Sequence, residues 1–172
     1  MDWKLLVTQM VMVKSQIFEA DKEKLWPYNF PNVAASERQI QRMKKKIGKD
    51  LPVDYVDFLK TANGWKGFFQ NNDLIGTEDF DESKYVMLAN EEFFSLDEAV
   101  VEGIKKEELF LVGINLTDRD LFFLVLSDNE KKGEVVWFAG EEVERFKNFS
   151  DFFASMIAYN KRELHKLKGE PV

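Results

Sequence analysis

The chain has 172 residues, of which 45% are hydrophobic and 14% aromatic, so it can bury a core and is not globally disordered. It contains no cysteine and one histidine. These counts exclude disulfide frameworks, thiol nucleophiles, zinc sites with cysteine ligands and metal sites with several histidines. Composition thus argues against most familiar enzyme chemistries, and we expect no catalytic residues, no cofactor and no metal.

Charge is distributed unevenly along the chain. The net charge is −7, yet residues 67–130 alone carry 16 acidic and 4 basic side chains, a net charge of −12. A polyanionic segment repels nucleic acid and anionic membranes, and it attracts basic protein surfaces. Two interpretations stay open: a solvated surface kept soluble by its charge, or an acidic face that docks a partner.

The first segment predicts an amphipathic helix, because apolar residues recur at intervals of three and four between Trp3 and Phe18. Its apolar stretch, Leu5–Val13, is far shorter than the about 20 residues that span a bilayer, and no signal-peptide cleavage site follows. With the missing cysteines, this predicts a cytoplasmic protein. The next segment, Leu25–Pro31, holds three aromatic residues and two prolines. We expect it to pack across the domain surface and to tie the first helix down.

Two further helices are predicted before residue 65. Ser36 and Gln39 fit a capping box at the start of the second helix, and Gly48 ends it. Leu51–Pro52 begins the third helix, with proline at the first helical position. Asn63–Gly64 is expected to cap its end.

The remainder of the chain is rich in strand signals. Phe68–Phe69 precede a turn at residues 71–73, and Tyr85–Leu88 is a short strand candidate. A second capping box at Ser95 predicts a short helix to about Ile104. Three closely spaced apolar runs then predict an antiparallel meander: Leu109–Ile114, Leu121–Leu126 and Val135–Ala139.

These three runs are apolar at successive positions, so we expect helices to cover both faces of the sheet. A last helix begins near Ser150, with Phe149 placed as a hydrophobic staple in front of it.

Few residues suggest chemistry. His165 lies in a lysine-rich final helical turn, where a solvated imidazole is expected. The stretch from Asn71 to Glu82 overlaps a calcium-loop template, but Ile75 stands where an oxygen ligand is required. Neighbouring carboxylates such as Glu141 and Glu142 are expected to be solvated, because adjacent residues point apart.

Residues 37–65 nevertheless resemble the opening motif of the SUKH superfamily, the group of fungal cell-wall assembly regulators and bacterial immunity proteins. The joint spacing of the pieces carries the resemblance: Glu37, Ile40, Met43, Ile47–Gly48, Leu51–Pro52, Asp54–Tyr55, Phe58–Leu59 and Asn63–Trp65. It covers about residues 36–160. One departure is Lys44–Lys46, where such helices often carry glutamate.

The resemblance implies an α+β fold with a mixed, mainly antiparallel sheet flanked by helices. We expect a single domain over residues 1–172, in which 1–35 form an extra N-terminal helix and aromatic connecting segment and 36–168 form the core. The resemblance implies no catalytic residues. It implies a protein that binds, since bacterial members neutralise toxins encoded beside them.

The expected function is therefore an immunity protein that binds a cognate protein toxin with a basic, possibly nuclease-type, domain. The alternative is a scaffold or regulatory module of the cell-wall-regulator type without a toxin partner. No nucleic acid or membrane is expected as a partner, and the chain is expected to be a monomer or weak dimer. Charge density selects the candidate partner-binding residues: Glu78, Asp79, Asp81, Glu82, Glu91, Glu92, Asp97 and Glu98.

Overall fold

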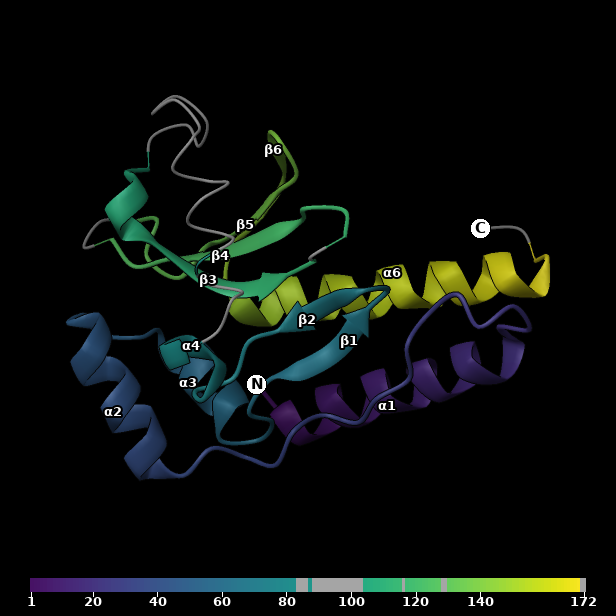
Figure 1. Cartoon of the computed structure of the whole chain (residues 1–172), viewed down its shortest axis with the longest axis horizontal. Helices are drawn as coiled ribbons and strands as arrows, with labels where there is room; N and C mark the ends of the chain where they lie inside the picture. The colour runs from purple at the N-terminus through teal and green to yellow at the C-terminus, as the bar shows by residue number, and fades with distance from the viewer. Residues whose placement is uncertain (83–86, 88–103, 116, 128–129, 171–172) are drawn as a thin grey trace.

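The computed structural model describes residues 1–82, 87, 104–115, 117–127 and 130–170. Helices and one antiparallel sheet make up an α+β fold with an N-terminal helix (Figure 1). In chain order the elements are α1 (Trp3–Ala20), α2 (Glu37–Ile47), α3 (Val53–Leu59), β1 (Trp65–Phe69), β2 (Asn72–Leu74), α4 (Asp79–Glu82), the 3-10 turn η2 (Lys106–Glu108), β3 (Leu109–Ile114), β4 (Leu121–Val125), β5 (Val135–Phe138), β6 (Glu142–Phe146) and α6 (Phe149–Lys168).

The six strands form a meander in the order β1-β2-β3-β4-β5-β6, and every neighbouring pair is antiparallel. The three runs predicted as strands are β3, β4 and β5. The strand β6 is not among the predicted strands, because Glu142–Arg145 lack an apolar run. The side chains of β6 before Phe146 are exposed or half-buried, so the strand needs no such run.

Alternate residues of the central strands point to opposite faces of the sheet and belong to two separate apolar clusters. On β4, Phe122 and Leu124 point into the main core, whereas Leu121 and Phe123 belong to the second cluster on the opposite face. The main core packs against residues of α1, α3 and α6. Helices therefore cover this face, as expected. Cover of the opposite face by a helix stays a prediction, because the helix expected from Ser95 lies outside the described residues.

Helix α1 runs alongside α6, and the segment after it is bonded to the rest of the domain (Figure 1). The Trp26 indole donates to Glu163 on α6 (3.3 Å), and the Trp65 indole on β1 donates to the carbonyl of Asn29 (2.8 Å). These bonds confirm that the aromatic segment packs across the domain. The segment is joined to α1 by the Lys14 ammonium, which donates to the carbonyl of Pro27. Among the described helices, none is both long and apolar enough to cross a bilayer.

Local signals set most helix ends. The Ser36–Gln39 capping box is formed, and Gly48 ends α2 with φ +69°. The predicted end of α3 is wrong: the helix stops at Leu59, and Lys60 is its C-cap. Pro52 likewise occupies the N-cap rather than the first helical position.

Two further boundaries differ from expectation. Helix α6 begins one residue early, with Asn148 as its N-cap, so Phe149 is a fully buried core residue rather than a staple. The turn expected at residues 71–73 is shorter, because Asn72 already pairs in β2. Residues Asp79–Glu82, at the end of the stretch that overlaps the calcium-loop template, form a single turn of helix, α4. The candidate strand Tyr85–Leu88 lies outside the described residues except for Met87.

Leu59 is fully buried in the main core. Leu59→Ala should lower the free energy of unfolding by about 2–5 kcal/mol, because it removes packed methyl groups and leaves a cavity. Urea unfolding measures this, with Val53→Ala as the control at an exposed position of the same helix. Equal stability of Leu59→Ala and the unchanged chain would contradict the core position of α3.

Lys14 is the one lysine among the buried polar residues of the described chain, and its ammonium donates to the Pro27 carbonyl (3.2 Å). Burial removes water from the charged ammonium and so lowers the pKa of Lys14 from 10.5 to about 8. Between these two values the unfolded chain holds a proton that the folded chain has released. The contribution of Lys14 to the free energy of unfolding therefore rises with pH between about pH 8 and 10.5, and it is smallest below about pH 8.

Lys14→Met should therefore be more stable than the unchanged chain at pH 7. This advantage should shrink by up to about 1.4 kcal/mol per pH unit between about pH 8 and 10.5. Urea unfolding of both proteins across this range measures the difference. A difference that is independent of pH would contradict the lowered pKa.

Candidate functional site

Asn63 joins the turn after α3 to the loop after β2. Its amide nitrogen donates to Thr77 Oγ1 (2.9 Å), and the Thr77 backbone N–H donates to its carbonyl oxygen Oδ1 (2.8 Å). The Asn32 side chain donates to the Asn63 backbone carbonyl (3.0 Å), and the Asn32 N–H donates to the carbonyl of Gly64 (3.0 Å). Asn63 thus holds three separate segments together.

Two glycines allow the backbones of these segments to touch. A Cβ on Gly64 would lie 2.6 Å from the nitrogen of Gly76, and a Cβ on Gly76 would lie 2.4 Å from the carbonyl oxygen of Asn63. Gly64 also has φ +85°, a conformation that other residues rarely adopt. The role of Asn63–Gly64 is therefore contact with residues 76–77 and not the capping of α3.

A polar groove of about 450 Å³ opens where these segments meet. We call it the Asn63 groove. Its lining comes from the connecting segment, from α2, from the turn after α3 and from the loop that leads into α4. The lining residues are Asn32, Val33, Ala34, Gln39, Asn63, Gly76, Glu78 and Asp79.

Glu78 and Asp79 supply the negative charge of the groove. Gln39 donates from Nε2 to Glu78 Oε1 (2.8 Å), and the Gly76 N–H donates to Asp79 Oδ2 (3.2 Å). Each carboxylate is thus positioned through one oxygen, and the other oxygen can accept from a ligand. The Asn63 groove is therefore suited to a cationic or N–H-bearing group.

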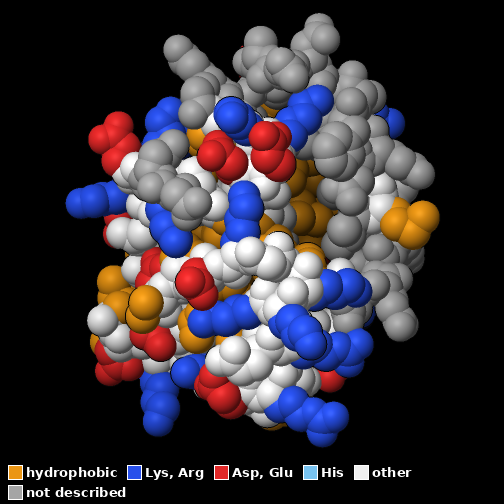
Figure 2. Space-filling model, turned by 90° about the vertical axis from the view of Figure 1, so that its left-hand side faces the viewer, with side chains coloured by type: hydrophobic (Ala, Val, Ile, Leu, Met, Phe, Trp, Pro, Cys, Tyr) orange, Lys and Arg blue, Asp and Glu red, His pale blue; other side chains and the backbone are white. Residues whose placement is uncertain are grey.

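A basic helix borders this acidic groove. Helix α2 carries Arg38, Arg42 and Lys44–Lys46, and Lys and Arg side chains gather in the lower half of Figure 2, on the side that α2 forms. The Lys46 ammonium lies 5.9 Å from the ring centre of Phe80 in α4. Residues 67–130 contain 16 acidic and only 4 basic side chains, but the fold places a cation of α2, Lys46, against α4 in this acidic segment. The face around the groove therefore carries both signs of charge.

The structure places two of the candidate partner-binding residues, Glu78 and Asp79, in the groove. Asp81 and Glu82 follow them in α4. The remaining four candidates, Glu91, Glu92, Asp97 and Glu98, lie outside the described residues. Asn32, Gln39 and Asn63 are not among the candidates predicted from the sequence, because a polar residue lines a groove only through segments that are distant in the sequence.

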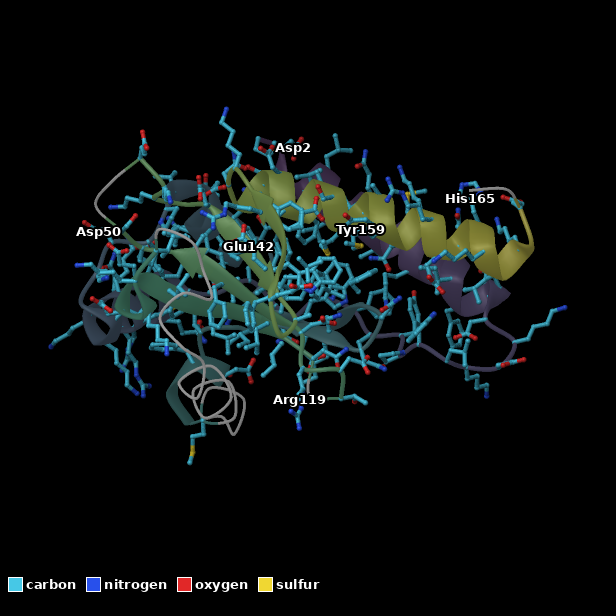
Figure 3. All side chains as sticks on the ribbon, turned by 90° about the horizontal axis from the view of Figure 1, so that it is seen from above. Asp2, Asp50, Arg119, Glu142, Tyr159 and His165 are labelled. Carbon is cyan, nitrogen blue, oxygen red and sulfur yellow. The ribbon has the colours of Figure 1, made fainter. Side chains whose placement is uncertain are left out.

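The other residues considered as candidates for chemistry, in the calcium-like stretch and at His165, make contacts within the protein itself. In the calcium-like stretch, Asp73 accepts from the Gly67 N–H (2.7 Å) and Ile75 is buried. His165 is exposed near the C-terminal end of α6, distant from Asp50 and Glu142 in Figure 3, and its Nδ1 lies 2.6 Å from Glu170. Across the described ranges, no three His, Cys, Asp or Glu side chains group as a metal site.

Gly64→Ala should destabilise the chain more than Gly140→Ala does. Both glycines have positive φ, and each substitution should cost about 1–3 kcal/mol in backbone strain. Only Gly64 has atoms within contact distance of the added methyl group, whereas Gly140 has none within 4 Å. Urea unfolding of the two variants compares them, and equal losses of stability would contradict the close backbone contact.

Comparison with known proteins gives one family. No curated protein matches the chain. A model of the SMI1 / KNR4 family (SUKH-1) matches residues 34–155, which include α2, α3, the six strands of the described sheet and the lining of the Asn63 groove apart from Asn32 and Val33. Helix α1 and the last part of α6 lie outside this match. The match covers well over half of the chain, and the chain therefore belongs to the SMI1 / KNR4 (SUKH-1) family.

Proposed function

We propose that the chain is a non-catalytic protein-binding domain, an immunity protein that neutralises a cognate toxin in the cytoplasm of the cell that makes both. Membership of the SUKH-1 family is consistent with an immunity-type domain of this kind. The alternative proposal is a scaffold or regulatory module without a toxin partner. The observation that carries the leading proposal is the Asn63 groove with its two positioned carboxylates.

The Asn63 groove is better suited to binding a partner than to catalysis. His165 lies in the last turn of α6, and that end of α6 is on the opposite side of the domain from α2 and α4 (Figure 1). Each carboxylate of Glu78 and Asp79 is held by a donor of the protein itself. The groove walls are fixed by the hydrogen bonds of Asn63 and by the contact of Gly64 with Gly76. A rigid polar groove of this size suits one or two basic side chains of a partner, because little ordering is needed on binding.

The mixed charge around the groove favours a protein as the partner. Nucleic acid and anionic membranes carry one sign of charge, so Glu78 and Asp79 would repel a polyanion that the cations of α2 attract. A folded toxin can present a basic segment to the groove and an acidic one to α2. The proposed docking face therefore comprises the Asn63 groove and α2. We propose that it extends to Asp81, Glu82, Glu91, Glu92, Asp97 and Glu98.

Charge reversal in the groove tests this proposal. Glu78→Lys combined with Asp79→Asn changes the charge by three units, and asparagine keeps an acceptor for the Gly76 N–H. The partner to use is the product of a toxin-like open reading frame beside the gene. We expect association at least about tenfold slower, with the loss increasing at low salt, and failure to protect cells that express the toxin.

The matched control is Glu141→Lys with Asp57→Asn, the same change in charge at exposed positions outside the groove. It should bind and protect like the unchanged chain. If the groove variant folds and still protects fully, the docking face lies elsewhere. If the neighbouring product is neither toxic nor bound, the scaffold proposal replaces the immunity proposal.

A further inference from the structure

The outer face of α1 has an unusual composition for a solvent-exposed helix. Eight of its residues are exposed, and two of them are charged: Lys4, Leu5, Thr8, Gln9, Met12, Gln16, Phe18 and Glu19. On α2, by contrast, five of the six exposed residues are charged. Depletion of charge is typical of the centre of protein interfaces and unusual for a helix face that only meets water.

The apolar members of this face are aligned. Leu5 and Met12 are 54% and 59% exposed, and their separation of seven residues places them on one line along the helix. Phe18, near the end of α1, stacks on Tyr28 (4.9 Å between ring centres), and Tyr28 contacts Phe30 (5.5 Å). The exposed rings of Phe18 and Phe30 add apolar surface at this end of the helix. None of these exposed surfaces is needed to pack α1 on α6, because the opposite face of α1 does so.

The two charges lie at opposite ends of the face. Lys4 is in the first turn of α1 and Glu19 is in the last, about 22 Å apart at the helical rise of 1.5 Å per residue. Met12 lies close to the midpoint between them. The one other charged residue between them, Lys14, is buried. If a second α1 packs antiparallel on this face, Lys4 of each copy therefore meets Glu19 of the other, and the two Met12 side chains meet at the centre.

We propose that the outer face of α1 is the contact surface for a second copy of this chain, with the two α1 helices antiparallel across a two-fold axis near Met12. Such an interface is self-complementary, as two-fold symmetry requires. A parallel pair would instead set Lys4 against Lys4 and Glu19 against Glu19. The face lies outside residues 34–155, so this contact belongs to the N-terminal addition and not to the matched family region.

The dimensions of the face predict a weak dimer. A helix of 18 residues is about 27 Å long, and a contact strip of about 10 Å width gives a few hundred Å² per copy. Stable pairs bury about 800 Å² per partner. The net charge of −7 on each copy also opposes association, and salt screens this repulsion. Salt also weakens the two Lys4–Glu19 pairs, so the dimer should depend less on salt than docking through the Asn63 groove does.

Sedimentation velocity of the full chain tests the proposal, at concentrations from about 10 µM to about 1 mM, the range in which a weak pair dissociates. The unchanged chain should show a dimer that grows with concentration. Met12→Lys sets two like charges at the centre and should raise the dissociation constant by about tenfold or more. Val53→Lys introduces the same charge at an exposed valine of α3 and should leave the dimer unchanged.

A charge swap tests the antiparallel geometry. Lys4→Glu alone should weaken the dimer, because the introduced carboxylate would face Glu19 of the other copy, and adding Glu19→Lys should restore it. Thermal unfolding of each variant checks that the fold is kept. A chain that stays monomeric at the highest concentration, a Met12→Lys variant that dimerises like the unchanged chain, or a charge swap without recovery would overturn the proposal.

Discussion

The contact between the backbones at Gly64 and Gly76 determines how the helical N-terminal part of the chain meets the sheet. α2 and α3 precede this contact, and the loop that carries Glu78 and Asp79 follows it. Because the backbones approach so closely, the two loops cannot slide past each other, and the amide of Asn63 fixes their register through Thr77. The position of the carboxylates relative to α2 therefore follows from two residues without a side chain.

Gln39 connects this arrangement to the start of α2. Its carbonyl oxygen accepts from the Ser36 N–H (2.8 Å) and completes the capping box, while its amide nitrogen donates to Glu78. Glutamate is the other residue that suits this position in a capping box. A glutamate here would set a second carboxylate beside Glu78 and repel it. A neutral amide serves both the helix end and the groove.

The sequence was a good guide where structure depends on local contacts. The capping box at Ser36, the left-handed glycine after α2 and the apolar runs of β3, β4 and β5 act through near neighbours, and each was predicted. The predictions were wrong or incomplete where the local structure depends on contacts with segments that are distant in the sequence. Asn63–Gly64 has the composition of a helix end but contacts residues 76–77, and β6 is a strand because β5 pairs with it. Glu78 and Asp79 were selected for charge density, and the cations of α2 beside them are remote in sequence.

The charged side chains of β6 have a consequence for association between copies of this chain. β6 is the last strand of the described sheet, and Arg145 is paired with Glu142 on the same strand and with Glu134 near β5. A strand from another molecule that added to this edge would have to disturb these ion pairs and lie beside Glu144. Growth of the sheet from chain to chain is thereby opposed. At high protein concentration, cross-β association through the β6 edge is therefore disfavoured.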